Sequence, residues 1–448
     1  MTSTTLSSLA PGRVPESTAV PHALSDLGRT ALATLMLSCL WVTLQPFQTK
    51  FVEGASSGST VNQLGYGLLA LVGGLVLLTA TPRPALRALA TPAWIVMALV
   101  LVQSAAHSPT PDASLRAVLF ALAAMTSTTA VLCLTPSAAA FRLVLAGAAL
   151  AVLGLCYGGI VALPSAAIHD ASGPEAAHAG LWRGVYPHKN MAGPVMATLF
   201  FAGLYLLRCR WRLVGGTIAV LAAIFAIQTG SKTTAALLPA VAVLVTFGRM
   251  FGGRILPVVA LGVLLAGMAL LTLGAAISPR LYDLLQWILP GTTFTGRLDL
   301  WRFAIGVLGD RGWTGLGFES FWGTPLVKGA EISMELSWDP RGIVNAHNGF
   351  LDVAIALGWP GLACAVVVIV MLPFRDFLRI GQDREEVRLG DFFLMVLAFS
   401  LLNAMLESFL FSRNNPVWIS TWLAIVGLRL LASRRRVEGG PTGPAAAH

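Results

Sequence analysis

The sequence predicts an all-α protein that crosses a membrane about twelve times and carries one long extramembrane loop. Of its 448 residues, 56% are hydrophobic and only 11% are charged. A soluble domain averages about 25% charged residues, so this composition excludes an ordinary water-soluble protein. A membrane-spanning helix needs about 20 mostly apolar residues, and apolar runs of nearly this length recur along the chain.

Twelve apolar runs are predicted to span the membrane, which places both termini on the same side. The runs are residues 29–47, 61–80, 92–107, 114–134, 138–161, 190–207, 212–228, 232–249, 255–277, 347–372, 390–411 and 416–432. Five regions follow: a disordered N-terminus, nine helices, a large loop with short amphipathic helices, three helices and a tail. In that order they are residues 1–28, 29–277, 278–346, 347–432 and 433–448. No cleavable signal peptide is expected before the first run.

The distribution of positive charge predicts the orientation. Of the 30 Lys and Arg residues, 18 fall on the side of the termini and 12 on the opposite side, where six lie in the long loop. Long loops contribute little to orientation, so the positive-inside rule places both termini in the cytoplasm and the large loop outside. This retention of Lys and Arg accounts for the net charge of +9, so we predict no nucleic-acid partner.

Several kinds of site are excluded by their missing motifs. The chain has no DxD, no HExxH and no His/Cys cluster with the spacing of metal ligands, so neither a metal nor another cofactor is predicted. The glycines of GLGF, residues 315–318, lack the βαβ context of a nucleotide site. The five cysteines lie in or beside apolar runs without CxxC spacing, which is typical of small core residues.

Three segments gather polar residues on the predicted outer side: RGVYPHKN (183–190), TGRLDLW (295–301) and NAHNGFLD (345–352). Arg183 and Arg297 offer the planar forks of donors that bind phosphate. His347 has the ordinary pKa range of a general base. Each residue alone also fits a simple interfacial role, such as a cation that reaches the lipid headgroups. Together they favour a diphosphate leaving group beside an activated hydroxyl.

The order of these segments, followed by GWPG, resembles the O-antigen ligase and O-antigen polymerase superfamily. The PHKN and TGRLDLWRFA segments are most similar to exopolysaccharide polymerases of the succinoglycan type. The resemblance implies a metal-independent, inverting glycosyltransferase of the GT-C type, which uses undecaprenyl-diphosphate-linked glycan at the periplasmic face of the bacterial inner membrane. It further implies that Arg183 and Arg297 bind the diphosphate and that His347 deprotonates the acceptor hydroxyl. Supporting candidates are His188, Lys189, Asn190, Lys232, Asn348 and Asp352.

The acceptor separates the functions that remain open. A polymerase would join lipid-linked repeat units on their carrier, and is the favoured interpretation. A ligase would instead transfer the glycan to lipid A core or another acceptor. A lipid-linked oligosaccharide transporter is less consistent with titratable groups gathered on one face. Membrane lipid is a further expected partner, and family resemblance makes a chain-length regulator protein plausible.

Other polar and aromatic residues have simpler interpretations. Glu407 lies in or near the eleventh predicted span, where an acid is either functional, paired with Arg413 or the cap of a polar cavity. Trp287 and Trp301, on two short amphipathic helices of the long loop, are expected at the level of the lipid headgroups. The acidic residues of this loop are expected to be solvated. They are Glu319, Glu331, Glu335 and Asp339.

Overall fold

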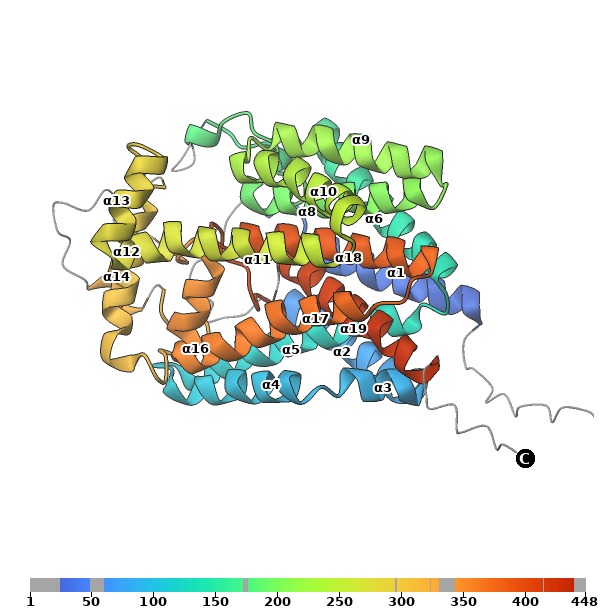
Figure 1. The fold of residues 1–448 in the computed structure, drawn as a ribbon, viewed down its shortest axis with the longest axis horizontal. Coiled ribbons are helices and arrows are strands. Elements are labelled where there is room, and N and C mark those ends of the chain that lie inside the picture. The colour runs from blue at the N-terminus through green and yellow to red at the C-terminus, as the bar shows by residue number, and fades with distance from the viewer. Residues whose placement is uncertain are drawn as a thin grey trace, which may run out of the picture.

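The computed structural model is a bundle of long helices that run along the long axis of the molecule (Figure 1). It describes residues 25–48, 60–171, 176–294, 296–322, 324–329, 343–413 and 415–438. Most of the predicted disordered N-terminus and the end of the tail therefore lie outside the described residues, as do Glu331, Glu335 and Asp339.

Eight helices of the described residues are long and apolar enough to cross a membrane. They are α2 (Thr60–Thr79), α5 (Pro111–Leu134), α6 (Ala138–Ala162), α8 (Lys189–Arg208), α10 (Lys232–Gly252), α11 with α12 (Ile255–Ile277), α16 with α17 (Gly349–Arg379) and α19 (Pro416–Glu438). A ninth span forms if α3 (Arg83–Leu89) and α4 (Pro92–Ser104), which are bent by 54°, count as one. The predicted all-α polytopic membrane fold is thereby confirmed.

Helices also occupy the three remaining predicted ranges. They are α1 (Asp26–Val42), α9 (Arg212–Gln228) and α18 (Arg384–Asn403). The first two are slightly shorter than a standard span, and α18 begins with the charged sequence REEVR. Each of the twelve predicted ranges therefore contains a helix.

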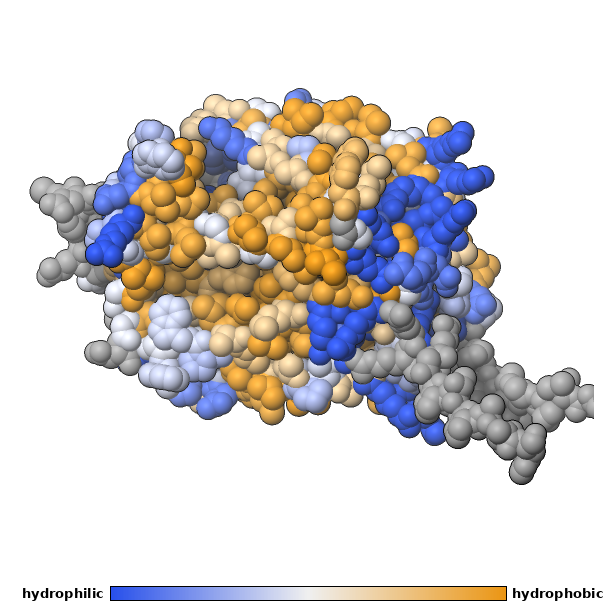
Figure 2. All heavy atoms as spheres, viewed as in Figure 1, coloured by the Kyte–Doolittle hydropathy of each residue, from blue (hydrophilic) through white to orange (hydrophobic). Residues whose placement is uncertain are grey.

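Apolar and polar surfaces divide the molecule along its long axis. Figure 2 shows an apolar band between two ends where hydrophilic residues gather, most densely at the right. We call this right end the arginine-rich end, because it carries the arginines of α3, of the end of α17 and of the start of α18. The opposite end, called the loop end, carries α13 (Pro279–Ile288), α14 (Arg297–Leu308) and α15 (Pro325–Lys328). This division is expected of a chain that spans a bilayer.

Two predictions about the loop end need correction. The helix predicted over residues 390–411 ends at Asn403, because α18 starts earlier, with its charged first turn at the arginine-rich end. Residues 404–411 form a turn instead, so Glu407 lies outside the helix. Trp301 is fully buried and donates its indole N–H to the carbonyl of Ala346 at 2.9 Å, so it is a core residue. Trp287 is highly exposed, as a headgroup anchor requires.

Small residues allow α8 and α9 to touch along their backbones. A Cβ atom built on Gly203 would lie 2.8 Å from the carbonyl oxygen of Gly215, and one built on Gly215 would lie 2.7 Å from the nitrogen of Leu207. Helix pairs in membranes commonly pack through such small residues, since close approach increases van der Waals contact. This pair holds the start of α8, which belongs to the loop end, against the neighbouring α9–α10 turn.

Gly215→Ala is expected to lower the thermal stability of the purified protein, although alanine favours a helix. The added methyl group would overpack the α8–α9 contact, a change that typically costs about 1–3 kcal/mol. Gly216→Ala is the matched control, because its new Cβ would meet only the Leu207 side chain, at 3.8 Å. Thermal unfolding in detergent measures both. Equal melting temperatures of the two variants would contradict the close backbone contact.

Candidate active site

The carboxylate of Glu407 connects three segments that are far apart in the sequence. Its Oε1 accepts hydrogen bonds from Asn190 Nδ2 at 3.1 Å and from Arg297 Nη2 at 3.0 Å. Its Oε2 lies 3.3 Å from His347 Nδ1. The start of α8, the start of α14 and the segment before α16 therefore meet at one side chain. Two of the three principal predicted residues, Arg297 and His347, are thus brought together.

Backbone contacts fix Glu407 opposite His347. The N–H of Gly349 donates to the carbonyl of Ala404 at 2.7 Å, and the Asn348 side chain donates to that of Met405 at 2.9 Å. The Asn348 N–H donates to Ser408 Oγ at 3.0 Å. The same buried Asn348 caps α16 by accepting from the Leu351 N–H at 3.0 Å. Asn348 thus joins the segment that carries His347 to the turn that carries Glu407.

Asp352 connects the His347 segment to the long loop. Its Oδ1 accepts from the Ala346 N–H at 3.1 Å and from the Trp322 indole at 2.8 Å. His347 itself adopts a left-handed backbone conformation, with φ of 49°. That conformation is unfavourable for a residue with a side chain and persists where the surrounding contacts impose it, which is common at functional sites. Asp352 supplies part of this constraint.

Charge in the site follows from burial and pairing. Burial alone would raise the pKa of Glu407, but the hydrogen bond from His347 and the positive charge of Arg297 outweigh burial and hold the pKa below its usual value. Glu407 is therefore ionised and acts only as an acceptor. The contact with His347 then requires the proton on Nδ1, which leaves Nε2 of the neutral ring as the acceptor. The His347 side chain is 33% exposed, so a substrate can reach it.

Arg297 is placed by a turn and anchored by two contacts. It is the first residue of α14 and follows Gly296, whose φ of 81° makes the turn into the helix. Its Nη1 donates to the carbonyl of Leu406, next to the pairing of Nη2 with Glu407. The side chain is 20% exposed. Its guanidinium therefore lies at the edge of the site, and its contacts with the described residues leave N–H groups for an anion.

Arg183 is held differently. Its guanidinium is buried and donates to three backbone carbonyls, those of Ala166 at 3.0 Å, Ser165 at 3.3 Å and Pro187 at 3.4 Å. These contacts shape the loop before α8. Contacts with described residues leave two of its five N–H groups, so its predicted role in diphosphate binding stays a prediction.

Three histidines pack against one another beside the start of α8. The rings of His169, His178 and His188 have centroids 5.2–5.7 Å apart and meet edge to face. His188 caps α8, since its Nδ1 accepts from the Asn190 N–H at 3.1 Å. His169 Nε2 accepts from the Lys189 N–H at 3.3 Å. Burial, together with the charges that His169 and His178 would carry, lowers the pKa of His188 to about 3, although Glu407 acts in the opposite direction.

The two predicted lysines flank this cluster. Lys189 is the first residue of α8, and the exposed Lys232 is the first residue of α10, after the cap Ser231. Gly193 of α8 packs against this turn, because a Cβ there would lie 2.6 Å from Thr234 Oγ1. The charges of Lys189 and Lys232 interact with each other, and Lys189 also interacts with Glu407. Lys189 therefore adds positive potential beside the carboxylate, and Lys232 lies close enough to Lys189 for their charges to repel.

Sequence reasoning missed the central position of Glu407. Of the alternatives left open for Glu407, pairing with Arg413 is not the one observed, because Arg413 pairs with Glu319 at 3.4 Å. Glu319 is exposed, as expected of a solvated loop residue, and this ion pair is its contact with the end of the 404–413 segment. The one available signal for Glu407 was an acid within an apolar run.

Comparison with known proteins found one protein family that matches part of the chain. Residues 217–366 match the O-antigen ligase family. The predicted resemblance to the O-antigen ligase and polymerase superfamily is confirmed for this region, which contains Lys232, Arg297, His347, Asn348 and Asp352. Glu407 and the segment from Arg183 to Asn190 lie outside it. No curated protein matches the chain.

The O-antigen ligase match indicates a multi-pass membrane protein with glycosyltransferase activity of the ligase or polymerase type. It also implies a lipid-linked glycan as substrate. These statements agree with a cationic site at one end of an apolar band.

His188 predicts how stability depends on pH. Because its pKa falls from 6.5 in the unfolded chain to about 3 in the fold, the stability from the neutral ring is fully present above pH 6.5 and is lost as the pH falls toward 3. His188→Asn keeps a capping acceptor without the titration, so its melting temperature should fall less than that of the wild type between about pH 7.5 and about pH 4.5. His188→Ala should lose stability at both pH values. An unchanged pH dependence in His188→Asn would refute the assignment.

Proposed function

We propose that the protein is a polysaccharide polymerase that transfers a glycan from a polyprenyl diphosphate to a hydroxyl group of another lipid-linked repeat unit. The observation that carries this proposal is the simultaneous pairing of Glu407 with His347 and Arg297. A base and an anion-binding group are thereby held beside each other at the loop end. Group transfer from a diphosphate to a hydroxyl requires both.

His347 acts as the general base in the proposed reaction. Its Nε2 accepts the proton of the acceptor hydroxyl as that oxygen attacks the anomeric carbon of the donor. Nδ1 donates to Glu407, whose negative charge stabilises the imidazolium that forms, as carboxylates paired with catalytic histidines do. Glu407 also orients the ring, so it is a positioning residue.

Arg297 stabilises the leaving group. As the bond between the anomeric carbon and the diphosphate oxygen breaks, negative charge develops on the diphosphate, and a fixed guanidinium stabilises it. Lys189, Lys232 and Arg183 add positive charge nearby. Attack from the face opposite the leaving group inverts the anomeric configuration, in agreement with the inverting GT-C type that the family resemblance implies.

The proposed setting is the periplasmic face of the inner membrane, with both termini in the cytoplasm. The excess of arginine at the opposite end supports this orientation. A polyprenyl tail remains in the bilayer while its diphosphate reaches residues at the boundary of the apolar band. Similarity to exopolysaccharide polymerases at PHKN and TGRLDLWRFA favours a repeat unit as acceptor, and a chain-length regulator would act through a separate chain.

A ligase is the second candidate function, since the matched family is described as O-antigen ligase. It shares the donor chemistry and differs in handing the glycan to lipid A core or another acceptor.

Transfer by the purified protein tests the site. With synthetic undecaprenyl-diphosphate-linked repeat units and EDTA, the wild type should form longer glycans. Arg297→Ala should slow transfer by about 10²–10³, because one electrostatic contact to the leaving group is lost. His347→Ala should slow it by about 10²–10⁴ through loss of the base. Arg183→Ala should also be slow, and Arg280→Ala, an exposed arginine of α13, is the control.

The acceptor supplied decides between the two candidate functions. Longer glycan on the lipid carrier, with repeat units alone, supports the polymerase. Transfer that occurs only after lipid A core is added would make the protein a ligase. Full activity of His347→Ala, with its melting temperature unchanged, would overturn the general base under either function.

Glu407→Gln is expected to slow transfer by about 10² or more, because the ring loses its orienting charge. Since Glu407 acts through His347, the double variant Glu407→Gln with His347→Ala should be about as slow as His347→Ala alone. Rates of the single and double variants from single-turnover assays give the coupling free energy between Glu407 and His347. Multiplicative effects in the double variant would show that Glu407 does not act through His347.

A further inference from the structure

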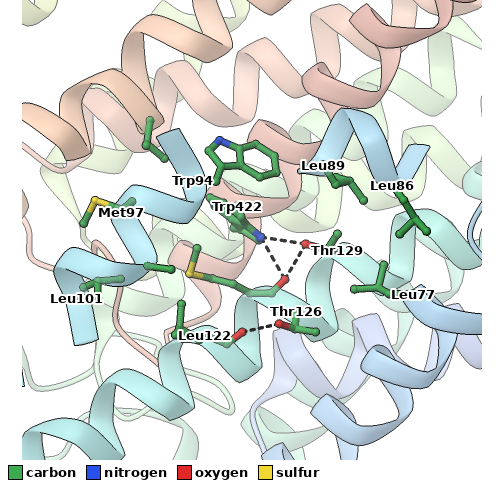
Figure 3. A pocket seen from close by; sticks show the side chains of 13 residues that line it. Leu77, Leu86, Leu89, Trp94, Met97, Leu101, Leu122, Thr126, Thr129 and Trp422 are labelled. Atoms are coloured by element: carbon green, nitrogen blue, oxygen red, sulfur yellow. Dashed lines mark hydrogen bonds between the residues drawn. The ribbon is translucent and has the colours of Figure 1, made fainter. Parts of the chain in front are cut away.

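A cavity of about 240 Å³ lies far from the candidate active site, in the half of the apolar band nearer the arginine-rich end. Figure 3 shows its walls, which come from α2, α3, α4, α5 and α19, together with Val368 in the helical turn between α16 and α17. Leu77 near the end of α2, Leu86 and Leu89 of α3, and Trp94 and Met97 of the first turns of α4 line it.

The walls of the cavity are mostly apolar, and the polar groups of Trp422, Thr126 and Thr129 bond within them, whereas the buried Trp94 indole N–H has no hydrogen-bond partner among the described residues. The Trp422 indole donates to the carbonyl of Met125 and to Thr129 Oγ1, both at 3.1 Å. Thr126 Oγ1 donates to the carbonyl of Leu122 at 2.8 Å. A cavity of this kind excludes water and accepts hydrocarbon, and even a cavity of about 150 Å³ holds a benzene molecule. The cavity suits part of an acyl chain.

The cavity also has a route from the bilayer. Helices α2 and α4 both pack against α5 but make little contact with each other. Both present exposed apolar side chains, such as Leu75 and Leu78 of α2 and Leu99 of α4. The space between α2 and α4 therefore faces lipid.

Positive charge lies at the same end of the cavity. Arg83 and Arg87 are exposed on α3, the two-turn helix whose Leu86 and Leu89 line the walls, and neither pairs with an acidic group among the described residues. Arg429 holds α3 in place by donating to the Ala88 carbonyl at 2.9 Å. Two exposed cations on a helix that lines an apolar cavity match the anionic headgroup and the chain of one lipid.

We propose that this cavity binds one anionic phospholipid from the leaflet at the arginine-rich end. One acyl chain enters between α2 and α4, and the phosphate lies beside Arg83 and Arg87. The lipid fills the space behind the bend between α3 and α4. Because α4 also packs against α16, bound lipid supports the helix that follows His347. The site is separate from the proposed transfer reaction and does not depend on it.

Native mass spectrometry of the purified full chain tests the proposal. We would add phosphatidylglycerol or phosphatidylcholine with identical chains. The wild type should retain one phosphatidylglycerol at least about tenfold more strongly than phosphatidylcholine. Ala98→Phe, which fills the cavity from its α4 wall, should abolish this retention. Leu99→Phe, at the neighbouring exposed position, is the matched control and should behave as the wild type. Arg83→Gln with Arg87→Gln should bind the two lipids equally.

A second measurement covers the case in which Ala98→Phe fails to fold. Phosphatidylglycerol brominated on its chains should quench the fluorescence of Trp94 and Trp422 in the wild type, and the quenched fraction should fall in Trp94→Phe. Equal retention by Ala98→Phe and Leu99→Phe, or a quenched fraction that is unchanged in Trp94→Phe, would overturn the site. Stronger retention of undecaprenyl phosphate than of phosphatidylglycerol would overturn its assignment to a phospholipid.

Discussion

The ionised carboxylate of Glu407 is the constraint on which the loop end depends. A largely buried charge without partners is unfavourable, so the fold must bring positive and hydrogen-bonding groups to it. Asn190, Arg297 and His347 supply them from three distant segments. The bonds that Asn348 makes to the 404–411 turn hold Glu407 next to these partners. Helices α8, α14 and α16 are therefore fixed relative to one another by the same charge that the proposed chemistry uses.

Buried acids are also paired with cations at the arginine-rich end, where they join helices to one another. Buried Asp391 lies between Arg249, at 2.6 Å, and Arg208, at 2.7 Å, and joins α18 to α10 and α8. Asp376 pairs with Arg429 at 3.2 Å and thereby links α17 to α19. In these networks acids are paired with arginines alone, whereas Glu407 is paired with both Arg297 and the partly exposed His347. This difference separates ion pairs that hold helices together from a site that can accept a proton.

The sequence predicted the helices well because apolar runs of bilayer length carry the information locally. It also drew attention to Arg297 and His347, which the structure brings together at Glu407, since charged and titratable residues are conspicuous beside such runs. The position of Glu407 could not be predicted, because its partners lie 60, 110 and 217 residues away along the chain. Trp301 was misplaced for the same reason: its partner Ala346 and its burial depend on how the long loop folds back. The end of α18 was misjudged because charged residues were excluded from the predicted span, although they form its first turn.

Glu407, the shared partner of Arg297 and His347, couples departure of the diphosphate to removal of the hydroxyl proton in the proposed reaction. In the free site, Glu407 divides its negative charge between Arg297 and His347. A donor diphosphate at Arg297 would compete with Glu407 for that guanidinium, and the competition grows as negative charge builds on the leaving group. Glu407 is then freer to stabilise the imidazolium that forms at His347. Departure of the diphosphate and removal of the hydroxyl proton therefore favour each other, so positive charge that Arg297 gives to the leaving group does not weaken the base.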